Sequence, residues 1–167
     1  NDFVKKHHYS GKVVPNSNLH FGCFLDEKLH GVMSFGGSTD KRKTITYCTN
    51  TAWNEFLELN RMAFDDYLPK YSESRCISIA IKLIKKNAPH IKWILSYADG
   101  TLCGDGTIYR ASGFQLIKAS ENSTIYEFPD GMRMSSLPLT NGGDLQSRTK
   151  IAKKYGDKIT SAASMKP

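Results

Sequence analysis

Apolar and polar residues in the first part of the chain follow the pattern of a β-hairpin. Residues 21–35 form two apolar-rich stretches, and the polar segment 26–28 joins them as a short turn. Both stretches are predicted to be strands of the main sheet. The following segment, 36–54, contains glycines and a basic run, so it predicts a loop that is interrupted by a short strand at 44–47.

A third strand is predicted at 55–64, where the polar Glu58 and Asn60 roughly alternate with two leucines. A helix is the competing interpretation of this stretch. The pattern breaks at 65–71, because Pro69 disfavours helical geometry in the residue before it. A new element therefore begins after this segment.

The clearest prediction is a helix from Arg75 to Asn87, with Ser72 as its N-cap. Lysines near its end complement the helix dipole, and Pro89 stops it. Its apolar residues recur at helical spacing and form a single stripe, Ile77, Ala80, Ile81 and Ile84.

The rest of the pattern completes an α/β order. The apolar run 91–97 predicts a central strand that is covered on both faces, and strand, helix and strand in this order predict a right-handed parallel crossover. A short helix is predicted at 107–112, with Gly113 at its C-terminal end. Residues 114–118 and 124–128 predict a closing hairpin.

These elements indicate one α/β domain over 1–136, followed by a basic C-terminal arm over 137–167, where the composition shifts to Thr, Asn, Gly, Ser and Lys. A chain of 167 residues is long enough to bury a core without a disulfide or a metal. Its four cysteines are far apart and form no CxxC pair, so we interpret them as reduced thiols.

Charge and hydropathy narrow the classes of partner. The net charge of +7 favours a polyanionic partner or an anionic cofactor, although a merely soluble basic protein is an equal alternative. No apolar run approaches the roughly 20 residues of a membrane span, and residues 1–6 lack the apolar stretch of a signal peptide. We therefore expect an intracellular protein with no membrane partner.

The first candidate site is the segment from Tyr71 to Arg75, at the start of the predicted helix. Free backbone N–H groups and the positive end of the helix dipole make this position a seat for a phosphate, and Arg75 can add a bidentate contact. Glu73 opposes an anion there. An ordinary N-cap beside an exposed arginine is the alternative.

Asp99 and Tyr109 are the next candidates. Asp99 follows the apolar run 91–97, where ligands bind in open α/β sheets, so it is a candidate general base or, alternatively, the cap of a turn. Tyr109 is near enough in sequence to share a cleft with Asp99, where its phenol would orient a nucleophile or protonate a leaving thiolate. A core tyrosine is the alternative.

Histidines near the start of the chain are the last candidates. His7 and His8 are adjacent, and two adjacent imidazoles point apart on a strand, so they do not chelate a metal by themselves. A metal there needs Asp99 or another distant ligand.

Several of these segments together resemble known families. The order of elements and the run Tyr-Arg-Ala-Ser-Gly-Phe at 109–114 resemble the GNAT acyl-CoA N-acyltransferases. The chain is more similar still to the phage Mom-type DNA adenine modification proteins, through five segments in the same order: His8-Tyr9-Ser10, Leu59-Asn60-Arg61-Met62, Tyr71-Ser72-Glu73-Ser74-Arg75, Ser96-Tyr97-Ala98-Asp99 and Gly106-Thr107-Ile108-Tyr109.

The resemblance implies a GNAT-like mixed sheet, centrally splayed and flanked by helices, with a functional core at 58–114. It implies a transferase that places a carbamoylmethyl-type group on N6 of adenine in phage DNA and so protects this DNA from host restriction. By the same resemblance the protein works in the cytoplasm of the infected bacterium. Its partner is double-stranded DNA, and the oligomeric state stays open between a monomer and a homodimer.

Site residues follow from the resemblance in the same way. It assigns catalysis to Arg61, Ser74, Asp99 and Tyr109, and the binding of an acyl-CoA or related donor to Ser72, Ser74 and Arg75. It assigns a divalent metal such as iron to His8 and Tyr9. Phosphate contacts to DNA are expected from two basic groups, Lys41, Arg42 and Lys43, and Arg148, Lys153 and Lys154.

The donor, the stacking surface for the base and the function itself each have more than one candidate. The segment 71–75 lacks the spaced glycines of the usual GNAT phosphate loop, so the donor is not fixed. An extruded base would need an aromatic surface, for which Trp53 and Tyr97 are candidates. The competing functions are an ordinary GNAT N-acetyltransferase for a small amine or a protein, and a DNA-binding module without catalytic activity.

Overall fold

The computed structural model describes residues 1–38, 40–98, 105–119, 125–127, 133–135 and 160–162. The chain divides into two compact units, Asn1–Ile117 and Lys118–Pro167. The boundary expected between residues 136 and 137 lies outside the described residues. Within the part described, no helix is long and apolar enough to cross a membrane.

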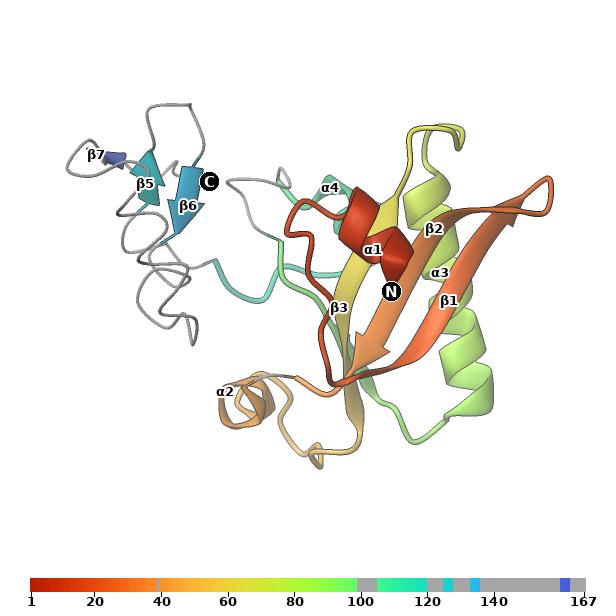
Figure 1. Cartoon of the computed structure of the whole chain (residues 1–167). Coiled ribbons are helices and arrows are strands. Elements are labelled where there is room, and N and C mark those ends of the chain that lie inside the picture. The colour runs from red at the N-terminus through yellow and green to blue at the C-terminus, as the bar shows by residue number, and fades with distance from the viewer. Residues whose placement is uncertain (39, 99–104, 120–124, 128–132, 136–159, 163–167) are drawn as a thin grey trace. The chain divides into compact units, whose positions relative to one another are not determined.

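The first unit is a four-stranded mixed sheet in the order β1-β2-β3-β4 (Figure 1). Strands β1 (Ser17–Leu25), β2 (Lys28–Gly36) and β3 (Phe56–Phe64) are antiparallel neighbours, and β4 (Trp93–Leu95) lies parallel to β3. The mixed α/β class predicted from the sequence is therefore confirmed.

The second unit contains a small antiparallel sheet in the order β6-β5-β7. Its strands are β5 (Ile125–Glu127), β6 (Arg133–Ser135) and β7 (Thr160–Ala162). The strand predicted at 124–128 is confirmed over the residues of β5. The predicted hairpin partner is wrong, because 114–118 contains no strand and β5 pairs with β6 and β7.

The predicted hairpin of β1 and β2 is confirmed, and its turn consists of Asp26 and Glu27. Both residues have positive φ, 49° and 61°, which is the backbone of a type I′ turn. This turn matches the twist of the two strands. It fixes the register at the hairpin end, where Leu25 lies opposite Lys28.

Helix α3 (Ser72–Asn87) covers one face of the sheet, and its apolar stripe forms the main core. The predicted helix and its end before Pro89 are confirmed. The predicted cap is wrong, because Tyr71 is the N-cap and the hydroxyl of Ser72 donates backward to the carbonyl of Pro69, 2.7 Å away. The buried members of the core are Met33, Phe35, Leu59, Ile77, Ala80 and Ile84.

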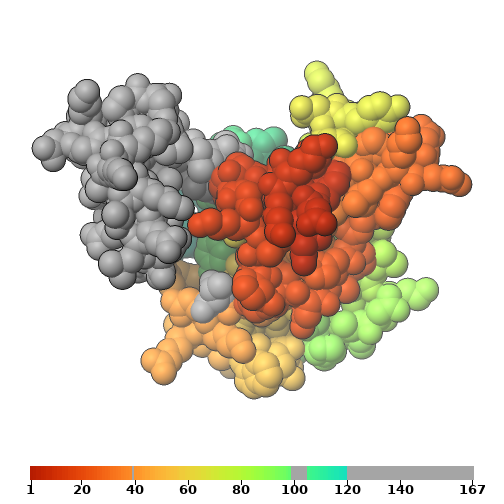
Figure 2. All heavy atoms as spheres, in the orientation of Figure 1, coloured from red at the N-terminus to blue at the C-terminus, as the bar shows by residue number. Residues whose placement is uncertain are grey.

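Helix α1 (Asp2–His7) lies on the opposite face of the sheet from α3 (Figure 1). Residues of the N-terminal segment cover this face in the space-filling view (Figure 2). The expectation that His7 and His8 lie on a strand is wrong. His7 ends the helix and its ring stacks on Phe3, one turn earlier, with 4.4 Å between the ring centroids.

Two further elements differ from the sequence prediction. The strand predicted at 44–47 is wrong, because α2 (Lys41–Ile45) forms there: the Asp40 side chain caps its N-terminus and Thr44 is fully buried. The run 91–97 is not a central strand. Only β4 forms, at the end of the described sheet, where Trp93 stays 47% exposed and its indole N–H donates to Thr51.

The short helix predicted at 107–112 is confirmed as α4 (Thr107–Ala111), and Gly113 follows it with φ of 86°. Positive φ suits glycine at the residue after a helix C-terminus.

Candidate functional site

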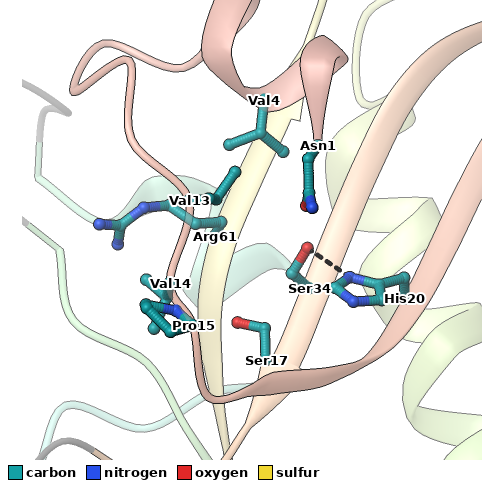
Figure 3. Close-up of a pocket in the computed structure, with 9 residues that line it drawn as sticks. All are labelled: Asn1, Val4, Val13, Val14, Pro15, Ser17, His20, Ser34 and Arg61. Atoms are coloured by element: carbon teal, nitrogen blue, oxygen red, sulfur yellow. Dashed lines mark hydrogen bonds between the residues drawn. The ribbon is translucent and has the colours of Figure 1, made fainter.

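A polar hollow lies on the face of the sheet that α1 covers. Alternation along the strands separates the two faces, so that Phe21, Met33 and Leu59 face α3 while His20 and Ser34 face the other way. On this second face, side chains from β1, β2, β3 and α1 surround a cavity of about 110 Å³ (Figure 3).

Two polar pairs lie at this cavity. The imidazole Nδ1 of His20 is 2.9 Å from the hydroxyl of Ser34, which is buried. The hydroxyl of Ser17 donates to the amide oxygen of Asn60 over 3.0 Å. The amide nitrogen of Asn60 is buried and has no hydrogen-bond partner, so this side chain keeps an unused donor in the interior.

Asn60 owes its position to a β-bulge. Arg61 pairs with Ser34 and Leu59 pairs with Phe35, so Asn60 is an extra residue on β3. β-bulges are frequent next to active sites, where they redirect side chains.

Arg61 lines the cavity with its aliphatic stem, and Figure 3 shows its guanidinium pointing away from the His20–Ser34 pair. Its Nε donates to the carbonyl of Lys12 at 2.9 Å, and one Nη donates to the carbonyl of Asn60 at 2.6 Å. These bonds fix the guanidinium at the edge of the hollow.

His8 lies close enough to Arg61 to sense its charge. Burial, and then the positive charge of Arg61, lower the pKa of His8 to about 4, so its imidazole is neutral at pH 7. Its Nδ1 accepts the backbone N–H of Ser10 at 3.1 Å, which places the proton of the neutral ring on Nε2. The ring of Tyr9 lies beside it, with 4.3 Å between the centroids.

The residues described around His8 do not complete a metal site. A metal ion bound at Nε2 requires the proton of the neutral ring to be on Nδ1. This conflicts with the structure, because Nδ1 accepts the backbone N–H of Ser10. Across the described ranges, no three His, Cys, Asp or Glu side chains come together to hold a metal ion. Iron at His8 and Tyr9 stays a prediction.

The donor-binding residues predicted at the start of α3 lie on the other face of the sheet. Ser72 and Arg75 line a mainly apolar groove of about 450 Å³ between α3 and the end of the β1–β2 hairpin. Ser74, the third predicted donor-binding residue, is not among the residues that line this groove. Its hydroxyl donates to the carbonyl of Tyr71 at 3.1 Å. Two cysteines, Cys23 and Cys76, also line the groove.

Tyr109 belongs to α4, which packs beside the start of α3. Its ring makes an edge contact with Phe114 and packs against the core on the α3 side, while the hydroxyl of Ser112 contacts the carbonyl of Ser74 at 3.4 Å. The structure therefore places Ser74 and Tyr109 on neighbouring helices. Arg61 and His8 lie together at the other face.

Comparison with known proteins assigns the family. The model of the Mom protein family matches residues 1–165. The chain belongs to the Mom protein family. It is also 38% identical over 124 residues to the methylcarbamoylase mom of Escherichia phage Mu, an alignment that covers 74% of this chain and 51% of the relative. The chain thus spans about half the length of this curated relative.

Of the two basic groups predicted to contact DNA in this Mom family member, the structure describes the first, on α2. Lys41, Arg42 and Lys43 are exposed on α2, and the ammonium of Lys41 lies 4.8 Å from the ring centroid of Trp53. Four predicted site residues lie outside the described residues: Asp99, Arg148, Lys153 and Lys154.

Sequence analysis of the Mom chain missed His20, Ser34 and Ser17, which supply hydroxyls and an imidazole to the cavity. The hairpin itself was predicted, with a turn at 26–28, but the observed turn is Asp26 and Glu27, and its register alone would set His20 opposite Met33. A bulge between Cys23 and Phe24 shifts the pairing by one residue and sets His20 opposite Ser34. No residue pattern in the sequence indicated that bulge.

Proposed function

We propose that this chain is a DNA-modifying transferase that adds a carbamoylmethyl group to N6 of adenine in phage DNA and so protects the DNA from host restriction. Membership of the Mom family supports this proposal, as does the name of the phage Mu relative, a methylcarbamoylase. The observation that carries it at the site is the position of Arg61, which lines the cavity beneath α1 and whose guanidinium is fixed by the carbonyls of Lys12 and Asn60.

In this proposal the exocyclic nitrogen forms a bond to the methylene carbon of the incoming group, and the bond between that carbon and the donor breaks. The nitrogen loses one proton to a base. The lone pair of N6 is delocalised into the purine, so a positioned base contributes to the rate. Asp99 is our candidate for that base.

Recognition of DNA has two parts in this proposal. The target base leaves the stack at a cost of a few kcal/mol, and exposed aromatic rings such as Trp53 or Tyr97 offer it a stacking surface. Phosphates are bound by the basic residues of α2, Lys41 to Lys43, and by Arg61, whose guanidinium keeps N–H groups beyond its two backbone bonds.

The donor in this proposal is a molecule related to an acyl-CoA whose leaving group is bonded to the methylene carbon, because an acyl-CoA itself would transfer its carbonyl carbon. Its support is the groove lined by Ser72 and Arg75, which combines an apolar surface with one cation. Both donors of Ser72, the hydroxyl and the backbone N–H, are directed to the carbonyl of Pro69, so Arg75 would be the main anion contact. A GNAT-type splayed sheet and a homodimer are further parts of the proposal.

Expression in a bacterium tests the activity, with the DNA digested to nucleosides and analysed by mass spectrometry. We expect a new adduct of deoxyadenosine that disappears in Arg61→Gln and in Asp99→Asn. The control His90→Gln changes an exposed residue between α3 and β4 and should modify DNA as the parent does.

Two outcomes would contradict the proposal. Unmodified DNA together with turnover of acetyl-CoA on a small amine would indicate an ordinary N-acetyltransferase. Unmodified DNA with strongly salt-dependent DNA binding would indicate a binding module without catalysis.

A further inference from the structure

The cavity under α1 combines a polar floor with an apolar wall. His20, Ser34 and Ser17 supply an imidazole and two hydroxyls, and Val4 and Val13 form part of the wall (Figure 3). Each of the polar groups can both donate and accept a hydrogen bond. The volume of about 110 Å³ has room for a group of a few heavy atoms.

No charged side chain of the lining points into this cavity. The only charged side chain among the lining residues is Arg61, and its guanidinium points away and donates to the carbonyls of Lys12 and Asn60. A carboxylate or phosphate would therefore enter without a direct ion pair. A neutral planar group that both donates and accepts hydrogen bonds suits this lining better.

Asn60 lies next to Ser17 beside the cavity and is not one of the residues that line it. This residue is 6% exposed, its amide oxygen accepts from the hydroxyl of Ser17, and its amide nitrogen has no hydrogen-bond partner. A buried donor without a partner is costly unless a ligand or a water completes it.

We propose that this cavity binds the primary carboxamide of the group being transferred, with Ser34 and His20 as the binding residues. This inference rests on the proposed function, in which the transferred carbamoylmethyl group ends in a neutral –CONH₂. The amide oxygen accepts a hydrogen bond from this floor, and the amide N–H groups donate to a hydroxyl or imidazole acceptor. The methylene lies toward the valines.

Binding is tested on the full chain with acetamide and acetate, which have the same shape and differ in charge. His20 is assigned in the NMR spectrum by the loss of its signals in His20→Gln. We expect acetamide to shift the His20 ring signals with a Kd of about 1–50 mM, as suits so small a ligand. Acetate should bind at least about tenfold more weakly.

A matched pair of serine variants separates binding from folding. Ser34 and Ser38 are both buried, at 5% and 4% exposure, and each hydroxyl has one side-chain hydrogen bond, to His20 and to Thr44. Ser34→Ala and Ser38→Ala should therefore lose similar stability. Only Ser34→Ala should weaken acetamide binding, by about tenfold for one lost hydrogen bond.

The same variants are tested for DNA modification in cells. We expect Ser34→Ala and His20→Gln to reduce the adenine adduct at least about tenfold relative to Ser38→Ala. An adduct made equally well by Ser34→Ala and Ser38→Ala would overturn the cavity proposal while the proposed function stands. The cavity proposal would also be overturned if acetamide left the NMR signals of the His20 ring unshifted, or if acetate bound as tightly as acetamide. If the parent chain makes no adduct but binds acetamide selectively, the proposed function fails and the cavity remains a carboxamide site.

Discussion

His8 shows how burial and a neighbouring charge together set the protonation state of a side chain. Burial, and then the charge of Arg61, lower the pKa of His8 to about 4, so that its imidazole stays neutral well below neutral pH. A neutral ring offers a donor at Nε2 and leaves Arg61 as the positive charge of this part of the site. The pair is therefore suited to an anionic substrate such as a phosphate, with the histidine as a hydrogen-bond donor.

Replacing Arg61 tests this pair. Arg61→Gln removes the positive charge, so we expect the pKa of His8 to rise from about 4 while it stays below the ordinary 6.5, because burial is the larger cause. The measurement is an NMR titration of the histidine ring signals. Arg110→Gln removes an exposed arginine that pairs with Asp105, and should leave the titration of His8 unchanged.

The same shift makes stability depend on pH. Between about 4 and 6.5 the unfolded chain binds a proton at His8 that the folded chain does not, so the free energy of unfolding falls as the pH drops through this window. Urea denaturation at several pH values, compared with His8→Gln, should show a shallower decline in the variant. An equal decline in both proteins would contradict the depressed pKa.

At the scale of elements, the turn of the β1–β2 hairpin contains a local conflict. Asp26 and Glu27 have positive φ, although an ordinary side chain disfavours that region and glycine does not. The hairpin forms because its strands pair along their length and β2 carries the core residues Met33 and Phe35.

Glu27→Gly should therefore stabilise the chain, by about 0.5–1 kcal/mol in the free energy of unfolding, because glycine adopts φ of 61° without strain. Chemical denaturation measures this change. Lys28→Gly, one residue further on and inside β2, should instead destabilise, since a glycine in a strand loses entropy and packing. Destabilisation by both variants would refute the turn geometry.

Strong periodicity and turn residues explain which elements the sequence predicted. The β1–β2 hairpin, β3, α3 and α4 each had a local pattern. α2 was missed because its stability comes from the Asp40 cap and a buried Thr44, which have no period. The run 91–97 looked central because it is apolar, but hydropathy does not say how many neighbours a strand has.

The bulge in β3 explains why that strand was hard to distinguish from a helix. Leu57, Leu59, Met62 and Phe64 all pack toward α3, although strict alternation would place Arg61 and not Met62 on that face. Asn60 supplies the extra residue. The irregular spacing of apolar residues is therefore a result of the bulge. The same spacing is also compatible with a helix, so the sequence pattern alone did not identify the bulge.

At the scale of the whole molecule, the excess of positive charge predicts a salt-dependent affinity for DNA. Changing Lys41, Arg42 and Lys43 to glutamine should reduce the magnitude of the slope of log K against log salt by as much as about 3. Fluorescence anisotropy on a duplex measures the slope. The same change at Lys82, Lys85 and Lys86, exposed on α3, is the matched control and should alter it less. An equal change of the slope in both triple variants would mean that DNA does not contact α2 in preference to α3.

Short segments of sequence name candidate residues but do not say which residues lie beside them. Arg61 and His8 were both chosen from short segments, yet their proximity depends on α1 packing against β3. The cavity residues His20 and Ser34 stayed hidden for a related reason, because strand register and a helix position decide which side chains meet. Such tertiary information is absent from any one segment.

The sheet itself separates the two hollows of the first unit, the small cavity under α1 and the larger groove beside α3. Separate small ligands in them do not compete for space, whereas a single donor occupies both only if it extends past the sheet. Competition experiments would then show independent saturation, and a compound that fills the groove would not displace a carboxamide from the cavity. For inhibitor design, the two hollows are separate targets with opposite polarity.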